Sequence, residues 1–339
     1  MSDHHRPSPL RTFLEKKGGA ASWRDWMEAA LYDPDNGYYT ANIRTVGRTG
    51  DFSTSATLGK ELGTAIAAWV KKEWERAGQK LPLIEIGPGD GSLHDQVMRA
   101  LGMTGRWRLR SHLVERSPVL RGRQQTSLKR CRHCLTWHEC LESALERCGG
   151  RALIFSNELA DAFPANLFQR DAGGWKEVWL SAAENGGIVE TLRPRPVQVR
   201  SSAFDIECQD GQRVEVLHSW REWLQKWVRH WKAGAMLTID YGGTPAEIYH
   251  RRPGGTVRGY FHHQRLAPTE LYPLMGRCDI TVDVNFTDLI EWGEAAGLSA
   301  EQMVTQRVFV QSKSSGPLQR EGGAADAFRC LIQRPPPVC

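Results

Sequence analysis

A glycine-rich segment at residues 81–93, LPLIEIGPGDGSL, carries the clearest chemical signal in the chain. Its apolar residues predict a strand buried on both faces, and the glycines after it allow a tight turn in which a ligand approaches bare backbone. A dinucleotide fingerprint needs a small residue at the sixth position of GxGxxG, where this chain has Ser92. We therefore expect a different nucleotide-type site. The expected contacts of this segment are Glu85, Gly87, Pro88, Gly89, Gly91 and Ser92.

Two further residues end the strands that we expect next along the chain. Glu115 closes the run at 108–115, about where an acid accepts hydrogen bonds from ribose hydroxyls in nucleotide-binding α/β folds. The alternative is a strand-end acid that faces water. Trp137 closes the run at 134–137 and is a further expected contact of the nucleotide.

An amide and two carboxylates follow the strand predicted at 151–158, in the segment SNELADAFP. Ligands of open α/β sheets bind outside the carboxyl ends of the strands, so Asn157, Glu158 and Asp161 should lie at the reactive centre. Glu158 and Asp161 are three residues apart, the spacing that places two side chains together on a helical turn. The alternative is that these acids only cap the following helix.

The elements that must position these residues alternate between strand and helix, which predicts a parallel, doubly wound sheet. A final core strand is expected at 235–242. Between the core strands lies an insertion with short alternating runs broken by glycine pairs, typical of an antiparallel hairpin or meander. The expected division is a helical extension and active-site cover at 1–77, a nucleotide-binding core at 78–164 and 234–313, an inserted substrate or partner subdomain at 165–233, and a tail at 314–339.

The insertion ends in a tryptophan-rich stretch, and a cysteine-rich segment precedes it. Trp220, Trp223, Trp227 and Trp231 repeat at helical spacing, which favours a buried helix face over a binding surface. Cysteines lie at 131, 134, 140 and 148 with histidines between them, but the second CxxC or HxxxH of a specific zinc site is missing. We therefore predict reduced thiols and no metal.

Residues near the two ends of the chain are candidates for a cover and a substrate side. Tyr38 and Tyr39 follow a turn and are expected substrate contacts, and Asp51 and Phe52 stand in a Gly, Ser and Thr loop and are expected contacts of the nucleotide-type ligand. Together they predict a lid over that ligand; the alternative, favoured equally by composition, is an ordinary surface loop. The pair at 262–263, of which His263 is the expected substrate contact, is a weaker candidate. Further strands are expected at 279–286 and 307–312, and the proline-rich end at 334–339 should be disordered.

Composition is that of an ordinary soluble protein, with 40% hydrophobic and 24% charged residues. The net charge of +5, from 44 basic and 39 acidic residues, comes without a basic block, so no nucleic-acid partner is expected. No run approaches the length of a membrane span, and the first residues lack the apolar core of a secretory signal. The expectation is a cytoplasmic protein without membrane insertion; homodimer formation is left open.

Seven motifs follow one another along the chain: GYY at 37–39, GDFSTS at 50–55, EIGPGDGSL at 85–93, LVERSP at 113–118, NELADAFP at 157–164, IDYG at 239–242 and CDITVDVNF at 278–286. This ordered set resembles the MidA-like methyltransferases, a family that includes the mitochondrial complex I assembly factor that methylates arginine. The family usually has Pro-Glu where this chain has Ala56 and Thr57, and Gly and Asp in place of Cys278 and Asn285.

The resemblance implies a Rossmann-like class I methyltransferase sheet, S-adenosyl-L-methionine as cofactor and arginine of a protein as acceptor. Glu85 would then suit the ammonium and sulfonium of the cofactor. Glu158 would orient the guanidinium and accept its proton, with Asp161 as a second clamp and Asn157 placing donor or acceptor. Two rival classes remain, a non-catalytic assembly scaffold that keeps the cofactor fold and a nucleotide-dependent oxidoreductase.

Overall fold

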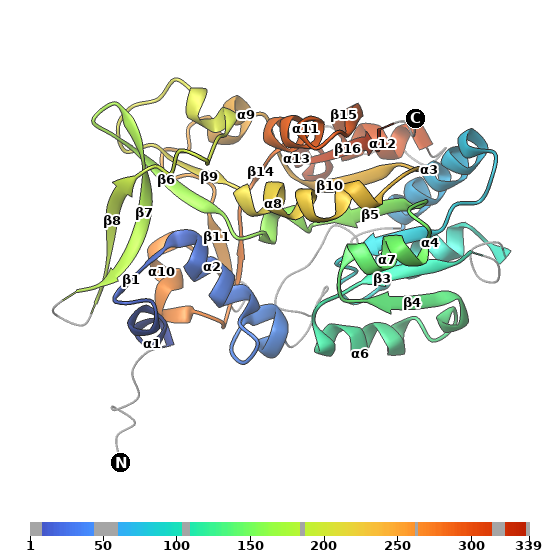
Figure 1. Cartoon of the computed structure of the whole chain (residues 1–339), viewed down its shortest axis with the longest axis horizontal. Helices are drawn as coiled ribbons and strands as arrows, with labels where there is room; N and C mark the ends of the chain where they lie inside the picture. The colour runs from blue at the N-terminus through green and yellow to red at the C-terminus, as the bar shows by residue number, and fades with distance from the viewer. Residues whose placement is uncertain are drawn as a thin grey trace, which may run out of the picture. The chain divides into compact units, whose positions relative to one another are not determined.

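The computed structural model describes residues 9–43, 60–103, 109–183, 187–261, 264–313 and 323–336. These residues form two compact units, each built from separate stretches of the chain. The first comprises Met1–Ile43, Ala162–Ser219 and Thr244–Asn285, and the second comprises Arg44–Asp161, Trp220–Gly243 and Phe286–Cys339. Figure 1 labels their helices and strands.

The second unit is a twisted sheet with helices on both faces. Its strands are β2 (Leu83–Ile86), β3 (Ser111–Val114), β4 (Leu135–His138), β5 (Leu153–Asn157), β10 (Met236–Gly243), β15 (Ser299–Thr305) and β16 (Phe328–Arg334). The helices are α3 (Glu61–Ala77), α4 (Ser92–Ala100), α6 (Pro118–Ser127), α7 (Leu141–Arg147), α8 (His218–Trp227), α11 (Phe286–Ala295), α12 (Gln306–Lys313) and α13 (Ala324–Ala327).

The order across this sheet is β15-β16-β10-β5-β2-β3-β4. The strands from β10 to β4 pair in parallel, and β16 pairs antiparallel with both β10 and β15. After β4 the chain returns to the other side of β2 to form β5, so the strand order reverses between β2 and β5. Such a switch point places the turns after two strands side by side and is where open α/β sheets bind ligands.

One hydrophobic core lies between the sheet and the helices α3, α4 and α12. It draws alternate residues from the strands, such as Leu83, Phe155 and Leu237, because successive side chains of a strand point to opposite faces. On the opposite face, Gln333 of β16 donates to the carbonyl of Leu289 in α11 at 3.4 Å. The predicted doubly wound α/β architecture is confirmed.

The tryptophan stretch packs as core, as its spacing predicted. Trp220, Trp227 and Trp231 are 0–2% exposed and Trp223 is half-buried, with successive ring centroids 4.7–5.9 Å apart. The helix is shorter than the pattern suggested, because α8 ends at Trp227 and a 3₁₀ turn at Val228–His230 follows.

The first unit is mainly antiparallel. Its strands are β1 (Ala20–Ser22), β6 (Asn166–Asp171), β7 (Gly174–Ala182), β8 (Ile188–Pro194), β9 (Arg213–Val216), β11 (Arg258–Phe261), β12 (Gln264–Leu266), β13 (Asp279–Thr281) and β14 (Val284–Asn285). Its helices are α1 (Pro9–Lys16), α2 (Trp23–Tyr32), α9 (Pro245–Tyr249) and α10 (Pro268–Leu271) with a π-helical turn at Tyr38–Asn42 and 3₁₀ turns at Ser202–Asp205 and Tyr272–Leu274.

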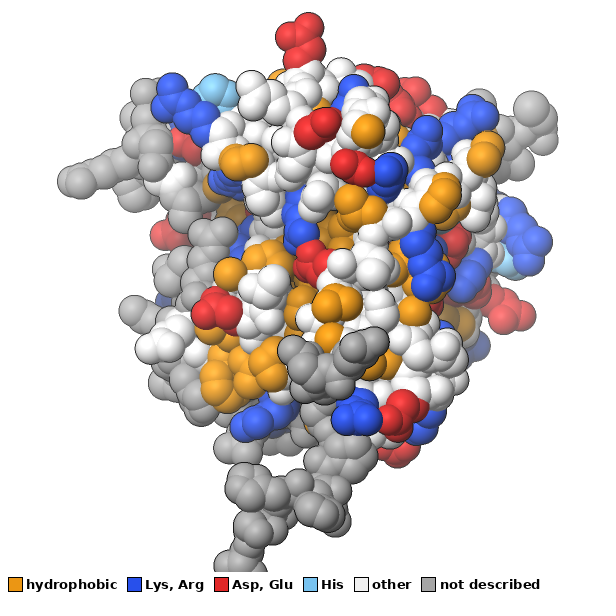
Figure 2. Space-filling model, turned by 90° about the vertical axis from the view of Figure 1, so that its left-hand side faces the viewer, with side chains coloured by type: hydrophobic (Ala, Val, Ile, Leu, Met, Phe, Trp, Pro, Cys, Tyr) orange, Lys and Arg blue, Asp and Glu red, His pale blue; other side chains and the backbone are white. Residues whose placement is uncertain are grey.

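The predicted antiparallel insertion is present as β6, β7 and β8. Asp171 and Gly174 close the first hairpin, and the two residues between them, Ala172 and Gly173, have φ of 48° and 74°. That pair of positive φ values marks the two-residue turn whose twist matches the strands. Figure 2, seen from the side on which β7 and β8 lie in Figure 1, shows hydrophobic side chains interspersed with charged ones, and Val189 of β8 is 41% exposed.

The unit boundaries differ from the expected division in several places. Helix α3, which we placed in the N-terminal extension, contributes to the core of the second unit, and 244–285 belongs to the first unit. The prediction of a tail at 314–339 is wrong for β16, because this strand lies between β15 and β10. Its burial pattern is that of an inner strand.

The strand predicted at 307–312 is also wrong. These residues form α12, whose Phe309 and Val310 pack in the core of the second unit while Val308 is 40% exposed. The short run RVFVQS fits a strand and a helix equally well by its hydrophobic pattern. The strand that the pattern missed is the preceding β15, whose largely exposed, polar residues give no apolar alternation.

The same substitution at two valines of α12 tests whether this segment is a helix or a strand. We expect Val310→Ala to lower the free energy of unfolding by about 2 kcal/mol, since Val310 is 3% exposed, and Val308→Ala to change it by less than about 0.5 kcal/mol. Chemical denaturation of both variants measures this. Equal losses would contradict the helix, because residues two apart share one face of a strand.

Candidate functional site

The loop after β2 has the backbone that a nucleotide site needs. Gly87, Gly89 and Gly91 have φ of 64°, 56° and 83°, a region that side chains rarely adopt. A Cβ on Gly87 would lie 2.8 Å from Leu159, so the turns after β2 and β5 touch at the switch point. Helix α4 then begins at Ser92, whose amide donates to the Asp90 carboxylate at 2.8 Å.

Glu85 does not face this loop. Its carboxylate is 2% exposed and pairs at 2.7 Å with Nδ1 of His94 on α4, whose Nε2 lies 3.0 Å from the Ser111 hydroxyl on β3. Burial raises the pKa of Glu85, and His94 opposes that rise. The prediction that Glu85 contacts the ligand is therefore replaced by an indirect role, in which the buried chain of three side chains ties β2, α4 and β3 together beneath the loop.

Glu115 lies at the carboxyl end of β3 and is held by hydrogen-bond donors of the following segment. Its carboxylate accepts from the Ser117 amide at 2.8 Å and from Gln124 Nε2 at 3.0 Å. Burial raises its pKa against the lowering effect of these bonds. The Arg116 amide also acts on this carboxylate as a donor. With roughly four acceptor positions, the carboxylate retains capacity to accept from a hydroxyl group.

Gln124 of α6 joins three of the predicted contacts. Its Nε2 also donates to the carbonyl of Gly89 at 2.8 Å, and its Oε1 accepts from Trp137 Nε1 at 3.0 Å. Gln124 is fully buried, whereas Trp137 is half-buried. The amide therefore sets the relative positions of the glycine loop, Glu115 and the half-exposed indole ring.

Asn157 is the last residue of β5, and Glu158 follows it. Asn157 Nδ2 donates to Glu158 Oε1 at 3.0 Å, and the buried Oδ1 of Asn157 accepts from no residue that the structure describes. Glu158 has a φ of 53°, which costs a non-glycine residue on the order of 1 kcal/mol. A strained acidic residue beside an unsatisfied buried oxygen is typical of a site that holds a ligand.

Asp240 of β10 maintains this turn. One carboxylate oxygen accepts from the successive amides of residues 159–161 at 2.8–3.3 Å, and the other accepts from the amide of Tyr241 at 2.9 Å. Asp161 is thereby held through its backbone, and its side chain is 5% exposed. Burial and the neighbouring Glu158 carboxylate raise the pKa of Asp240 to about 7, against the lowering effect of the amides.

Of the candidate cover and substrate residues, the structure describes Tyr38 and Tyr39. Tyr38 is buried, and the Tyr39 hydroxyl donates to Asp279 at 2.6 Å in the first unit, so this turn is anchored rather than a loose surface loop. Asp51, Phe52 and His263 lie outside the described residues.

The cysteine-rich segment holds free thiols. Cys131 is buried, and burial raises the pKa of Cys148 to about 11. No group of three or more metal-ligating side chains occurs among the residues that the structure describes, and none of its helices is long and apolar enough to cross a membrane.

The sequence pattern assigned no role to two residues that position the site, Gln124 and Asp240. Asp240 belongs to the IDYG motif, which was recognised without a role for its acid. Gln124 sits in a polar helix, PVLRGRQQTS, where only its position one helical turn from Leu120 and Leu128 marks it as facing the sheet.

The fold agrees with the comparisons with known proteins. Residues 65–304 match the family described as "Putative S-adenosyl-L-methionine-dependent methyltransferase". The fold is similar to that of a Burkholderia thailandensis protein solved with bound S-adenosyl-homocysteine, with a TM-score of 0.83 and 24% identity over 96% of this chain and 90% of that one. A native crystal structure of a protein from the same organism gives a TM-score of 0.80, also at 24% identity over 96% and 90%.

The names of curated relatives state an activity and a location. The Danio rerio protein named "Protein arginine methyltransferase NDUFAF7, mitochondrial" is 29% identical, covering 87% of this chain and 73% of its own length. Its Mus musculus counterpart is 26% identical over 88% and 71%. The cytoplasmic prediction is contradicted by these relatives, which are named as mitochondrial proteins; sequence patterning alone gave no sign of that location.

The raised pKa of Asp240 predicts a pH dependence of stability. Because the folded chain keeps this proton up to about pH 7 while the unfolded carboxyl loses it near 3.8, the free energy of unfolding should fall as the pH rises between these values. We expect the free energy of unfolding to fall less with pH in Asp240→Asn, because asparagine has no carboxyl group that titrates.

Denaturation curves between pH 4 and 8 test this expectation. Glu146→Gln, which alters an exposed carboxylate in the same unit, serves as the control and should keep the wild-type slope. A slope in Asp240→Asn identical to that of the wild type would show that Asp240 does not titrate in this range.

Proposed function

Because this chain belongs to the family of S-adenosyl-L-methionine-dependent methyltransferases, we propose that it transfers a methyl group to an arginine side chain of a protein. The class of enzyme and the cofactor follow from the family; the acceptor is the proposal. Two relatives at 29% and 26% identity are named protein arginine methyltransferases, which supports it. The observation that carries it is the acidic turn after β5, with Glu158 strained and Asp161 held by Asp240.

Three features of the described residues fit the cofactor. The glycine loop exposes backbone at three positive-φ positions, Glu115 retains free acceptor capacity, and Asn157 Oδ1 is an unsatisfied acceptor that suits an ammonium group. In the proposed arrangement Glu115 binds the ribose hydroxyls, Trp137 flanks the base and Asn157 accepts from the amino group. When bound, S-adenosyl-L-methionine supplies an electrophilic methyl group on a sulfonium.

The protein side chains must make the acceptor nucleophilic. A guanidinium has a pKa above about 12 and delocalised lone pairs, so it is a poor nucleophile. Glu158 orients the guanidinium, polarises it toward one nitrogen and accepts the proton that the reaction releases. Asp161 is the second clamp. Asp240 keeps the turn in place through the backbone, so that the Glu158 carboxylate needs no further reorganisation.

The proposal also assigns the cofactor contacts and the expected substrate contacts to particular units. The cofactor contacts of this proposal belong to the second unit, and Tyr38 and Tyr39, the substrate contacts expected from the sequence, belong to the first. A role in the assembly of respiratory complex I, which the family resemblance implied, would make a subunit of that complex the acceptor. Labelled-methyl transfer into a lysate, followed by mapping of the modified residue, identifies the acceptor.

We expect Glu158→Gln to lower the rate of methyl transfer by at least about 100-fold, since the variant loses the proton acceptor, while the cofactor Kd stays within about twofold. Labelled transfer and isothermal titration with S-adenosyl-homocysteine measure the two quantities. Normal turnover in this variant would eliminate Glu158 as the base.

We expect Glu115→Gln to weaken cofactor binding about tenfold, because a charged acceptor of two hydroxyl groups becomes neutral. Glu139→Gln is the matched control, since Glu139 also follows a strand of the sheet but is exposed. Titration with S-adenosyl-homocysteine measures both.

Thermal-shift titration with NAD in parallel excludes the oxidoreductase class if only the methyl donor or its product stabilises the protein.

A further inference from the structure

A second concave site lies in the second unit, away from the predicted cofactor contacts. It has a volume of about 210 Å³ and is lined by Glu73, Arg76, Ala77, Leu81, Arg151, Ala233, Gly234 and Arg334. Three of the eight lining residues are arginines, and nothing in the methyltransferase reaction uses them. The walls between them are small or apolar.

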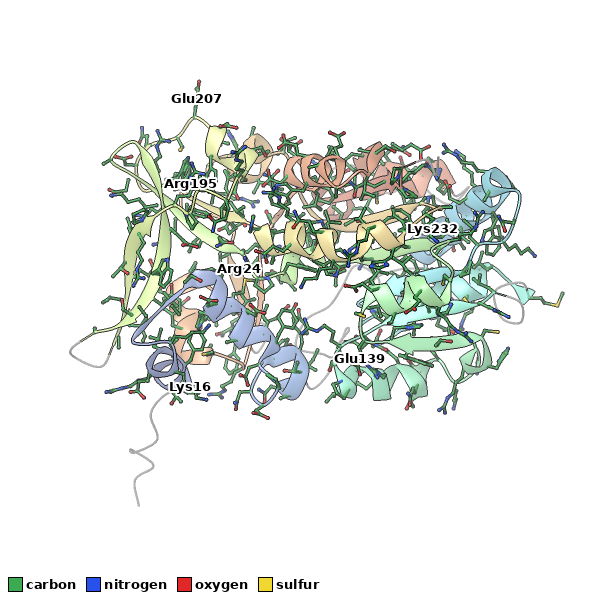
Figure 3. All side chains as sticks on the ribbon, in the orientation of Figure 1. Lys16, Arg24, Glu139, Arg195, Glu207 and Lys232 are labelled. Atoms are coloured by element: carbon green, nitrogen blue, oxygen red, sulfur yellow. The ribbon has the colours of Figure 1, made fainter. Side chains whose placement is uncertain are left out.

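The position of this pocket follows from the direction of the strands. Leu81 precedes β2, Arg151 precedes β5 and Gly234 precedes β10, so the pocket lies at the amino edge of the parallel strands. The glycine loop, Glu115 and Asn157 all follow carboxyl ends. In Figure 3, Lys232 before β10 and Glu139 after β4 mark these two edges, at opposite ends of the strands.

Two acidic side chains neutralise only part of the basic charge. Arg334 binds Glu73 through two hydrogen bonds of 2.9 Å and also pairs with Glu301. Arg76 shares Glu301 at 2.6 Å. The three lining arginines therefore face two carboxylates.

The remaining positive charge is available to a ligand. Arg151 makes no side-chain hydrogen bond or ion pair with any residue that the structure describes, and only one nitrogen of Arg76 is used. Lys313 lies within electrostatic reach of Glu73 and Glu301, and burial and Lys72 lower its pKa. Even with Glu73 and Glu301 counted, positively charged side chains are in excess around the pocket.

We propose that this pocket binds a small tetrahedral oxyanion, either inorganic phosphate or the phosphate group of a monoester. Guanidinium groups match the geometry of such oxygens and can each donate two hydrogen bonds, and Arg151 and Arg76 have the donors to do so. Ala77, Leu81 and Ala233 complete the wall of the pocket. Because the pocket lies at the edge opposite the glycine loop, the oxyanion does not compete with the cofactor.

The bound oxyanion also adds a link between elements that ion pairs already join in part. Arg76 lies in the last turn of α3, Arg151 precedes β5, and Arg334 is the last residue of β16. An oxyanion between them reduces the repulsion among like charges, so binding stabilises the folded second unit in proportion to occupancy.

The test is a titration of the full-length protein with inorganic phosphate at constant ionic strength, read by thermal unfolding and by isothermal calorimetry. We expect a saturable rise in Tm with phosphate that chloride does not produce. Arg151→Gln should raise the phosphate Kd about tenfold, while Arg130→Gln, which removes an exposed arginine outside the pocket, leaves it unchanged. Titration with glucose 6-phosphate in parallel distinguishes the sources, because tighter binding of this monoester than of free phosphate assigns the site to a phosphorylated molecule.

Two results would overturn the proposal. One is the absence of a phosphate-specific stabilisation, and the other is an equal loss of phosphate binding in the two arginine variants. The cofactor Kd, measured in the same Arg151→Gln protein, should remain that of the wild type. Loss of S-adenosyl-homocysteine binding there with intact folding would refute the separation of the two sites, whereas the methyltransferase proposal is tested independently through Glu158.

Discussion

The hydrogen bonds from the backbone amides of residues 159–161 to Asp240 are the interaction on which the carboxyl edge of the sheet depends. Parallel strands that end at one edge leave amide donors without a neighbouring strand, and each buried amide left unpaired costs about 1–3 kcal/mol. A single buried carboxylate on the adjacent strand satisfies them. This arrangement allows Glu158 to keep a backbone conformation that the chain would otherwise avoid, and thereby places acidic chemistry beside the glycine loop.

The polar contacts at the two edges of the sheet have opposite character. Carboxyl and amide acceptors gather after β2, β3 and β5, where Gln124 ties Glu115 to the carbonyl of Gly89. Arginines gather at the amino edge around Arg151. The acceptors suit a ligand with ammonium and hydroxyl groups, whereas the arginines suit an anion. A separation of this kind lets one sheet hold two chemically unlike ligands without direct interference.

The sequence predicted the parts of the fold and site that depend on local pattern. The β2 strand and its loop are recognisable because a continuous apolar run meets glycines that need positive φ, and the acids after β3 and β5 follow from their place at strand ends. The side-chain direction of Glu85 was not predictable, since it depends on His94 reaching back from α4. Gln124 and Asp240 were missed for the same reason, because their partners come from other elements.

The elements near the carboxyl terminus were the hardest to predict. The run at 307–312 is too short for its apolar spacing to separate helix from strand. β15 is an antiparallel edge strand whose residues are largely exposed, so it lacks an apolar face, and its pairing is visible only through β16.

The placement of β16 between β15 and β10 has a consequence for the protein during its synthesis. Phe328–Arg334 follow the other strands of the sheet in the chain, so the edge of β10 keeps unpaired amides and carbonyls until this segment is synthesised. An exposed edge on a nascent chain is a template for pairing with other chains. A chain that lacks Phe328–Arg334 would therefore present the edge of β10 to other chains.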